Sequence, residues 1–223
     1  TLLGKHTLAG KDRVRAFIPG AAWVRIAENG ASLERVANTD LFEWHGPADQ
    51  VPDRYRLIWR DSHGAEHVSY DPYCFPPQLS DYDLHLFGEG KHWHIYQKLG
   101  AHLHTVDGID GVFFAVWAPN AERVSVIGDF NNWDGRCHPM RSLGSTGLWE
   151  IFIPDLVVGC LYKYEILNKH SKDFFAKTDP YGQEFECRPN TSSIVTDEKA
   201  YKWEDQNWME QRTKKDWLRS EEH

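Results

Sequence analysis

The segment from 129 to 135, Asp-Phe-Asn-Asn-Trp-Asp-Gly, places two large aromatic residues in a polar stretch typical of a loop. Loops normally contain little exposed aromatic area, because outside a core that area stays in contact with water. Trp133 is flanked by amide and carboxyl side chains, among them Asn131. An indole with hydrogen-bonding neighbours suits a sugar ring, whose C–H face packs on the indole while amides bind its hydroxyls. The alternative is a Trp133 folded back into a core; the polar flanks favour exposure.

Two expected strands must position this loop. Residues 113–118 are aromatic and β-branched, and Pro119-Asn120 predicts a turn after them. Residues 123–127 alternate apolar and polar positions, which is the period of a half-buried strand. The sequence therefore predicts strand, turn, strand and then the loop that carries Trp133.

This arrangement resembles carbohydrate-binding module family 48, the starch- and glycogen-binding β-sandwich that precedes the catalytic part of glycogen branching enzymes. Residues 96–102 (YQKLGAH) and 161–165 (LYKYE) resemble branching enzymes in particular, and the similarity extends from Leu3 to Tyr181. The resemblance implies the N-terminal part of a bacterial branching enzyme, whose carboxylate nucleophile and acid/base lie in a (β/α)8 barrel. It also implies no metal or organic cofactor, a cytoplasmic location, and as partners α-glucan (glycogen and malto-oligosaccharides) and the enzyme's own barrel.

The same resemblance implies a set of sugar-contacting residues. Trp133 would stack on glucose, with Asn131 beside it. Lys163 would lie beside the sugar, although its position opposite Tyr162 and Tyr164 on an alternating strand also suits a solvated lysine. Two further candidates follow from the family pattern: Phe175, in the region of a second aromatic platform, and Asn190, which could instead cap a turn. The set includes no catalytic residue and no metal ligand.

The chain contains an internal repeat that spans most of its length. The sequence around Pro19, a strand that ends in a turn followed by a second strand, recurs around Pro119. Three further pairs keep the same order: 41–44 with 148–151, 55–58 with 162–165, and 71–73 with 179–181. The sequence therefore predicts an all-β chain of two tandem immunoglobulin-like β-sandwiches. In the first copy a short hairpin turn at 28–32 replaces the Trp-bearing loop, which predicts a structural or interfacial role for that copy.

Short helices are expected in the linker and at the C-terminus. Ser80 is a predicted N-cap with acidic residues in the following turn, and Gly88 a predicted C-cap. Residues 201–218, with Trp203, Trp208 and Trp217, predict a helix that needs a partner surface. We therefore divide the chain into a degenerate first sandwich (1–90), a second sandwich of family 48 (91–200) and a helical connector towards the barrel (201–223).

Composition limits the remaining possibilities. Hydrophobic residues make up 41% and charged residues 26%, which predicts globular cores, and ten tryptophans suit glycan binding. The net charge of -8 argues against nucleic acid. No apolar run has the length of a membrane span, so we expect no membrane partner. The four cysteines lack metal-binding spacing and are expected as free thiols, and we expect a monomer that is a piece of a longer protein.

Metal binding is the main alternative chemistry in the sequence. His92/His94 and His102/His104 form two H-x-H pairs that could each supply two zinc ligands from a strand, but no carboxylate or cysteine has matching spacing. The sequence contains no phosphate-binding or hydrolase motif. Two alternative functions stay open: a stand-alone glycogen-binding or scaffold protein, and the N-terminal part of a debranching family-13 hydrolase.

Overall fold

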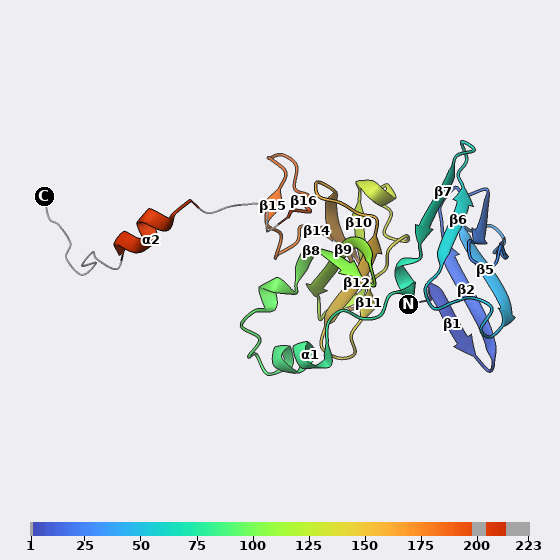
Figure 1. The fold of residues 1–223 in the computed structure, drawn as a ribbon, viewed down its shortest axis with the longest axis horizontal. Helices are drawn as coiled ribbons and strands as arrows, with labels where there is room; N and C mark the ends of the chain where they lie inside the picture. Colours follow the sequence, from blue (N-terminus) through green and yellow to red (C-terminus); the bar gives the residue numbers. More distant parts are fainter. Residues whose placement is uncertain (1, 198–203, 213–223) are drawn as a thin grey trace, which may run out of the picture.

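The structure, a computed structural model, describes residues 2–197 and 204–212. The predicted all-β class is confirmed: two β-modules lie side by side (Figure 1). Within the described ranges, no helix is long and apolar enough to cross a membrane.

The first module is one sheet of seven antiparallel strands in the order β1-β2-β5-β4-β3-β6-β7. Because β4 pairs with both β3 and β5, it joins the two layers of the module. Phe42 from one layer and Val24 and Leu57 from the other lie in one buried cluster. The strands are β1 (Gly4–Leu8), β2 (Lys11–Phe17), β3 (Trp23–Ile26), β4 (Ser32–Arg35), β5 (Leu41–Pro47), β6 (Arg56–Arg60) and β7 (Glu66–Tyr70).

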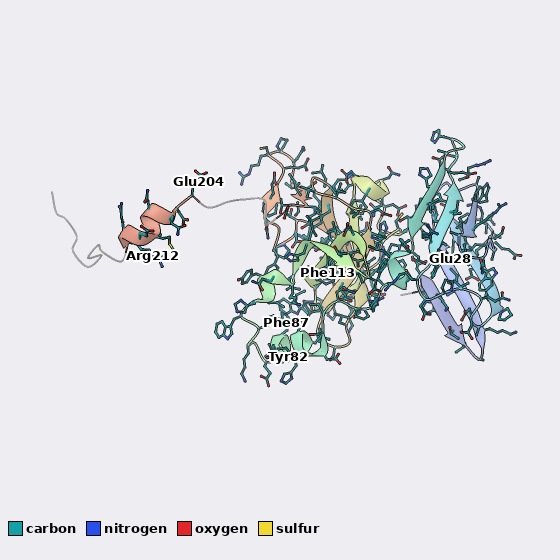
Figure 2. All side chains as sticks on the ribbon, viewed as in Figure 1. Glu28, Tyr82, Phe87, Phe113, Glu204 and Arg212 are labelled. Carbon is teal, nitrogen blue, oxygen red and sulfur yellow. The ribbon has the colours of Figure 1, made fainter. Side chains whose placement is uncertain are left out.

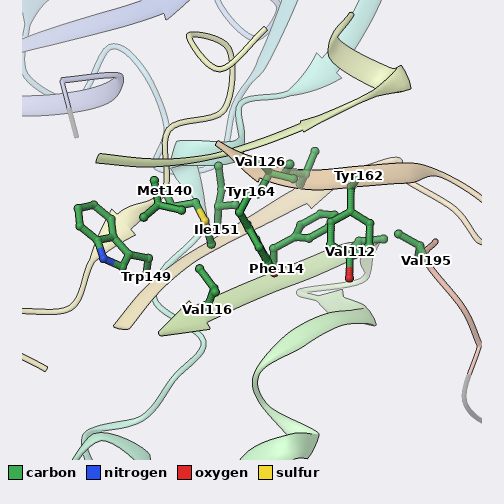
Figure 3. Close-up of a cluster of buried hydrophobic side chains, with 12 residues drawn as sticks. Val112, Phe114, Val116, Val126, Met140, Trp149, Ile151, Tyr162, Tyr164 and Val195 are labelled. Atoms are coloured by element: carbon green, nitrogen blue, oxygen red, sulfur yellow. The ribbon is translucent and has the colours of Figure 1, made fainter. Parts of the chain in front are cut away.

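The second module is a sandwich of two separate sheets. One has the order β11-β12-β9-β8, and the other β10-β13-β16-β15 with β14 also paired to β13. Side chains from both sheets, including Phe114, Ile151 and Tyr164, interdigitate in its core (Figure 3). The strands are β8 (Gly100–Val106), β9 (Ile109–Trp117), β10 (Ala121–Gly128), β11 (Arg141–Ser142), β12 (Leu148–Pro154), β13 (Leu161–Asn168), β14 (Phe174–Lys177), β15 (Glu184–Phe185) and β16 (Ser193–Ile194).

Strand pairing confirms the internal repeat. Every pair in the first module except β3–β4 has a counterpart seven strands later: β1–β2 with β8–β9, β2–β5 with β9–β12, β4–β5 with β11–β12, β3–β6 with β10–β13, and β6–β7 with β13–β14. The exception has a local cause. The β3–β4 hairpin is short, as predicted, whereas the loop with Trp133 separates β10 from β11. The corresponding pair is reduced to an isolated bridge between Ser125 of β10 and Pro139, two residues before β11.

Side-chain contacts repeat as well. In each module a buried aspartate accepts hydrogen bonds from a tyrosine hydroxyl and from a backbone N–H two residues further on: Asp71 from Tyr55 and the N–H of Tyr73, Asp179 from Tyr162 and the N–H of Tyr181. These are the residues whose spacing indicated the repeat in the sequence.

A second repeated contact lies at the start of each module. Gly4 and Gly100 have φ of 91° and 111°, and a side chain there would contact Tyr73 and Tyr181 respectively. Glycine is therefore required by conformation and by close approach. The histidine two residues further on bonds in each case to a carbonyl of its own segment: His6 Nε2 lies 3.1 Å from Leu3 O, and His102 Nε2 2.9 Å from Leu99 O.

The linker between the modules belongs structurally to the second one. Its Phe75 and Leu79 are buried in a cluster with Phe113 and Phe152, and helix α1 (Asp81–Gly88) adds Phe87 to that cluster's edge. The predicted N-cap is confirmed, since Ser80 and Asp83 form a capping box. The predicted C-cap is wrong: Gly88 is the last helical residue, Glu89 is the C-cap, and the left-handed residue is Gly90, with φ 67°.

Short 3-10 segments and one further helix complete the described chain. Figure 2 shows Tyr82 and Phe87 on α1; Tyr82 is 69% exposed. Helix α2 (Gln206–Arg212) confirms part of the predicted C-terminal helix and buries no residue, whereas Trp203 and Trp217 lie outside the described residues. The 3-10 segments are η1 (Pro72–Cys74), η2 (Ile95–Gln97) and η3 (Asp129–Asn131).

Candidate functional site

The loop between β10 and β11 holds Trp133 in an unusual conformation. Its first turn is η3, after which Asn132 and Trp133 both have left-handed backbones, with φ of 53° and 59°. A bulky residue rarely adopts this region, and such strain persists only where the surroundings impose it. The backbone N–H of Trp133 donates to Gly128 O at 2.9 Å, and its side chain is 39% exposed. The exposure predicted for this indole is therefore confirmed.

Asn131 holds the loop from inside. It is 7% exposed; its Oδ1 accepts from the N–H of Gly128 at 2.9 Å, and its Nδ2 donates to Val126 O at 2.9 Å and to His138 Nδ1 at 2.8 Å. These bonds leave no exposed amide group for a ligand. The expected direct contact of Asn131 with sugar is therefore corrected: the side chain supports the loop. The local sequence did not show this, because an asparagine can bond to its own backbone as readily as to a ligand.

The second half of the loop is fixed by a charged pair. Arg136 Nε lies 2.9 Å from Asp134 Oδ1, and its Nη2 lies 2.7 Å from Oδ2, so the guanidinium binds both carboxylate oxygens. These bonds hold the pKa of Asp134 below its usual range. Gly135 packs so closely on the carboxylate of Glu165 in β13 that a side chain there would collide with it. The loop thus lies against the outward face of the β10–β13 pair.

Lys163 lies on that outward face. Its register partner in β10 is Ile127, next to the residue where the loop begins. Tyr162 and Tyr164 are buried on the opposite face, as the alternation predicted. The ammonium group donates to Thr191 Oγ1 at 2.8 Å, a contact with no sequence signal of its own because it joins β13 to the segment before β16.

The adjacent phenylalanines of β14 lie on different faces. Phe174 pairs with Leu167 and therefore shares the face of Lys163, whereas Phe175 pairs with Ile166 on the face of Tyr164. The exposed fractions are 57% for Phe174 and 40% for Phe175. Phe175, expected in the region of a second aromatic platform, thus lies on the opposite face of the sheet from Lys163. Phe174, paired with Leu167, is the aromatic residue of β14 on the face of Lys163. A one-residue shift of register exchanges the faces, and the sequence pattern did not fix that register.

Asn190 lies in the turn between β15 and β16. Its Nδ2 donates to Glu186 Oε1 at 3.1 Å, and Glu186 also accepts from the N–H of Ser192 at 3.1 Å. The pKa of Glu186 is held below its usual range, mainly by hydrogen bonds from Ser192. The charge of Lys163 contributes less. Asn190 thus makes a contact that stabilises the turn, which was the alternative to sugar binding in the sequence analysis. It belongs to the same polar cluster as Lys163, Glu186 and Thr191.

The histidine pairs do not converge on a shared centre. His92 Nε2 lies 2.9 Å from Asp83 Oδ1, whereas His94 is the N-cap of η2 and its ring lies near that of Tyr96. His102 bonds to Leu99 O, and the ring of His104 lies near Phe113 and Phe152. In the part of the chain that the structure describes, no group of three or more potential metal-binding side chains is found.

Acidic pH is expected to destabilise the protein through His138, the partner of Asn131. Burial lowers the pKa of His138 from 6.5 to about 4, so the folded state favours the neutral ring. The unfolded chain takes up the proton first, and the stabilisation present above pH 6.5 is lost as the pH falls to about 4, by up to about 3 kcal/mol.

Urea unfolding at pH 7 and pH 4.5 checks this expectation. His138→Gln should lose less stability between the two pH values than the unmodified chain, because the glutamine does not titrate. Burial raises the pKa of Asp71 to about 6, which acts in the opposite direction, and the comparison with the variant removes that contribution. Equal losses in both proteins would contradict the assignment to His138.

Two family models match the chain. Residues 98–182 match carbohydrate-binding module 48 (isoamylase N-terminal domain), and residues 1–73 match the alpha-1,4-glucan branching enzyme GlgB, N-terminal domain. The class of protein is therefore a β-sandwich that matches carbohydrate-binding module 48, preceded by a module that matches the branching-enzyme N-terminal domain.

Sequence relatives identify the type of parent protein. The chain is 56% identical to the 1,4-alpha-glucan branching enzyme GlgB of Nitrosococcus oceani over 97% of its own length and 29% of that relative. It is 52% identical to the same enzyme of Cellvibrio japonicus over 98% of its length and 31% of that relative. The chain corresponds to the N-terminal region of a 1,4-alpha-glucan branching enzyme, and it spans less than a third of the curated relatives it matches.

Solved structures also resemble the chain at low identity. Pullulanase type I from Bacillus subtilis, determined in complex with maltose, matches with a TM-score of 0.39 and 16% identity over 86% of this chain and 26% of that one.

Proposed function

We propose that this region binds α-glucan, glycogen or malto-oligosaccharide, and positions it for a branching enzyme. The observation that carries the proposal is the exposed indole of Trp133, held in a left-handed conformation on a module of family 48. An exposed, rigidly held aromatic face loses little conformational entropy when a ligand covers it. The whole protein would cut an α-1,4 glucan and rejoin the segment through an α-1,6 bond.

The proposed site has three parts. Trp133 supplies the flat apolar surface for the C–H face of a glucose ring. Lys163, already hydrogen-bonded to Thr191, supplies an ammonium donor for a hydroxyl, and Phe174 extends the aromatic surface on the same face. Asn131 fixes the loop from below, and Asn190 orders the turn next to Thr191. A neutral polysaccharide needs no opposite charge on the protein, which is compatible with the net charge of -8.

We further propose that this region has no catalytic activity alone, that its second partner is the catalytic barrel of the parent enzyme, and that the parent is a cytoplasmic monomer that needs no cofactor. Packing of 75–90 on the second module favours a domain boundary near residue 74 rather than 90.

The proposed glucan site is weak for a single chain end, but glycogen presents many ends, so that several weak contacts act together.

Affinity electrophoresis tests the proposal. The chain should be retarded in a gel that contains glycogen and should migrate normally in a gel that contains dextran, an α-1,6 glucan. Migration unaffected by glycogen up to saturating concentrations would refute glucan binding by this region and would favour a structural role beside the barrel.

Lys163→Met is expected to weaken glycogen binding roughly two- to tenfold, because one hydrogen bond to a hydroxyl contributes about 0.5–1.5 kcal/mol net. The matched control is Lys11→Met, which removes the same charge from an exposed position in the first module. Retardation in gels of graded glycogen content gives both dissociation constants. Equal weakening by the two substitutions would show a general charge effect and would remove Lys163 from the site.

A further inference from the structure

The loop that carries Trp133 contacts the first module. The guanidinium of Arg136 lies 5.0 Å from the ring centroid of Phe17, the last residue of β2. The pKa of Arg136 is raised mainly by its hydrogen bond with Asp134. The charge of Asp40 in the first module lies close enough to raise it further. Arg136, Phe17 and Asp40 line one surface depression. The module without a Trp-bearing loop of its own thus contacts that loop in its neighbour.

The contact is connected to Trp133 through the backbone. Arg136 binds both oxygens of Asp134, the residue directly after Trp133. The N–H of Asp134 donates to Asn131 O at 3.1 Å, and the N–H of Cys137 donates to Asp134 O at 3.1 Å. A fixed Arg136 therefore fixes the position of Asp134, and with it one of the two peptide bonds that set the direction of the indole.

The space behind the loop makes this contact important. A cleft of about 360 Å³ separates the modules, with Phe17 and Trp59 on the side of the first module and Phe130, Asn132 and Asp134 on the side of the loop. Within the second module the bonds of Asn131 and the packing of Gly135 on Glu165 hold the loop, whereas along the cleft it lacks close packing on the first module. Across the boundary, the hydroxyl of Tyr73 donates to Cys137 O at 3.4 Å and to Pro139 O at 3.1 Å, and Phe17 contacts Arg136. The Phe17 contact is the one that acts on Asp134, because Arg136 binds that carboxylate.

We propose that the first module positions the glucan-binding loop of the second module through Phe17 and Arg136, and thereby raises its affinity for α-glucan. The proposal rests on the proposed function for its ligand. It gives the degenerate first copy a specific role, because that copy supports a binding loop that it does not itself possess. Phe17 and Arg136 are positioning residues, since neither needs to contact the sugar.

Variants of the complete chain test this proposal. Phe17→Ala and Arg136→Ala should each weaken glycogen binding about two- to fivefold, as loss of an exposed cation–π contact predicts. Arg136→Ala removes the contact with Phe17 and also the pair with Asp134, so the double variant should bind glycogen no more weakly than Arg136→Ala alone. Phe17→Tyr keeps the aromatic face and should bind as the unmodified chain does. The matched control is Arg25→Ala, which removes a comparable contact, 4.7 Å from the ring of Trp23, within the first module.

Hydrogen exchange of residues 129–137 provides a readout that does not depend on the ligand. Phe17→Ala should accelerate exchange of the Trp133 and Asp134 amides, and Arg25→Ala should not. Unchanged exchange, or unchanged affinity in Phe17→Ala and Arg136→Ala while Trp133→Ala fails to bind, would overturn the positioning role and leave the proposed function intact. An unmodified chain that does not bind glycogen would instead overturn the proposed function, and loop exchange would still decide whether the first module holds the loop.

Discussion

Trp133→Ala is expected to weaken glycogen binding by about tenfold or more. A tryptophan offers up to ~250 Å² of surface, and the exposed 39% of Trp133 is therefore roughly 100 Å². Covering that area is worth about 2.5 kcal/mol at ~25 cal/mol per Å², from which the entropy cost of ordering the sugar is subtracted. Affinity electrophoresis in glycogen gels measures the change, and Trp133→Phe should give an intermediate value because it keeps a smaller ring.

A second variant separates binding from folding. Trp133→Gly removes the indole and also suits the left-handed backbone, where a non-glycine residue costs on the order of 1 kcal/mol. This relief offsets part of the packing lost with the indole. Trp133→Gly should therefore lose glycogen binding while its thermal unfolding stays close to that of the unmodified chain. Undiminished retardation of both variants would exclude Trp133 as the platform and direct attention to Phe174.

The sequence predicted the parts of the fold that depend on repeated local patterns. The tyrosine-to-aspartate spacing, Tyr55 to Asp71 and Tyr162 to Asp179, indicated two copies of one module, and the structure joins both pairs by a hydrogen bond. Alternation along 161–165 placed Lys163 on the outward face because neighbouring side chains in a strand point to opposite sides. These features depend on chemistry within a few residues or on an internal repeat.

The candidate site was predicted less completely. The face occupied by Phe174 or Phe175 depends on the register of β14 against β13, which no local pattern specifies. The inward direction of Asn131 depends on a backbone turn that forms only when β10 and the loop are both in place. The contact of Arg136 with Phe17 joins two residues that are far apart in the sequence and lie in different modules, and nothing in either segment indicates it.

Asp179→Ala is expected to be the most destabilising of the substitutions considered. The carboxylate is 2% exposed and accepts from the hydroxyls of Tyr162 at 2.7 Å and Tyr164 at 3.1 Å, and from the N–H of Tyr181 at 2.8 Å. Alanine would leave the buried hydroxyl of Tyr162 and the N–H of Tyr181 without this acceptor, and would leave Tyr164 only its longer contacts to Gly100 O and Ala115 O, at 3.5 and 3.4 Å. Each buried unsatisfied group costs about 1–3 kcal/mol. We therefore expect a loss of about 3–5 kcal/mol, measured by urea unfolding followed by circular dichroism.

The repeat and the acid–base state of Asp179 make this prediction specific. Asp71 accepts from a single tyrosine hydroxyl, so Asp71→Ala should cost less than Asp179→Ala. Burial raises the pKa of Asp179, which means that its charge is disfavoured in the fold; Asp179→Asn, which keeps an acceptor and carries no charge, should therefore retain most of the stability. Asp173→Ala, at an exposed position near β14, is the matched control and should change little. If Asn proved as destabilising as Ala, the charge of Asp179 rather than its hydrogen-bond acceptors would be what holds the two tyrosines.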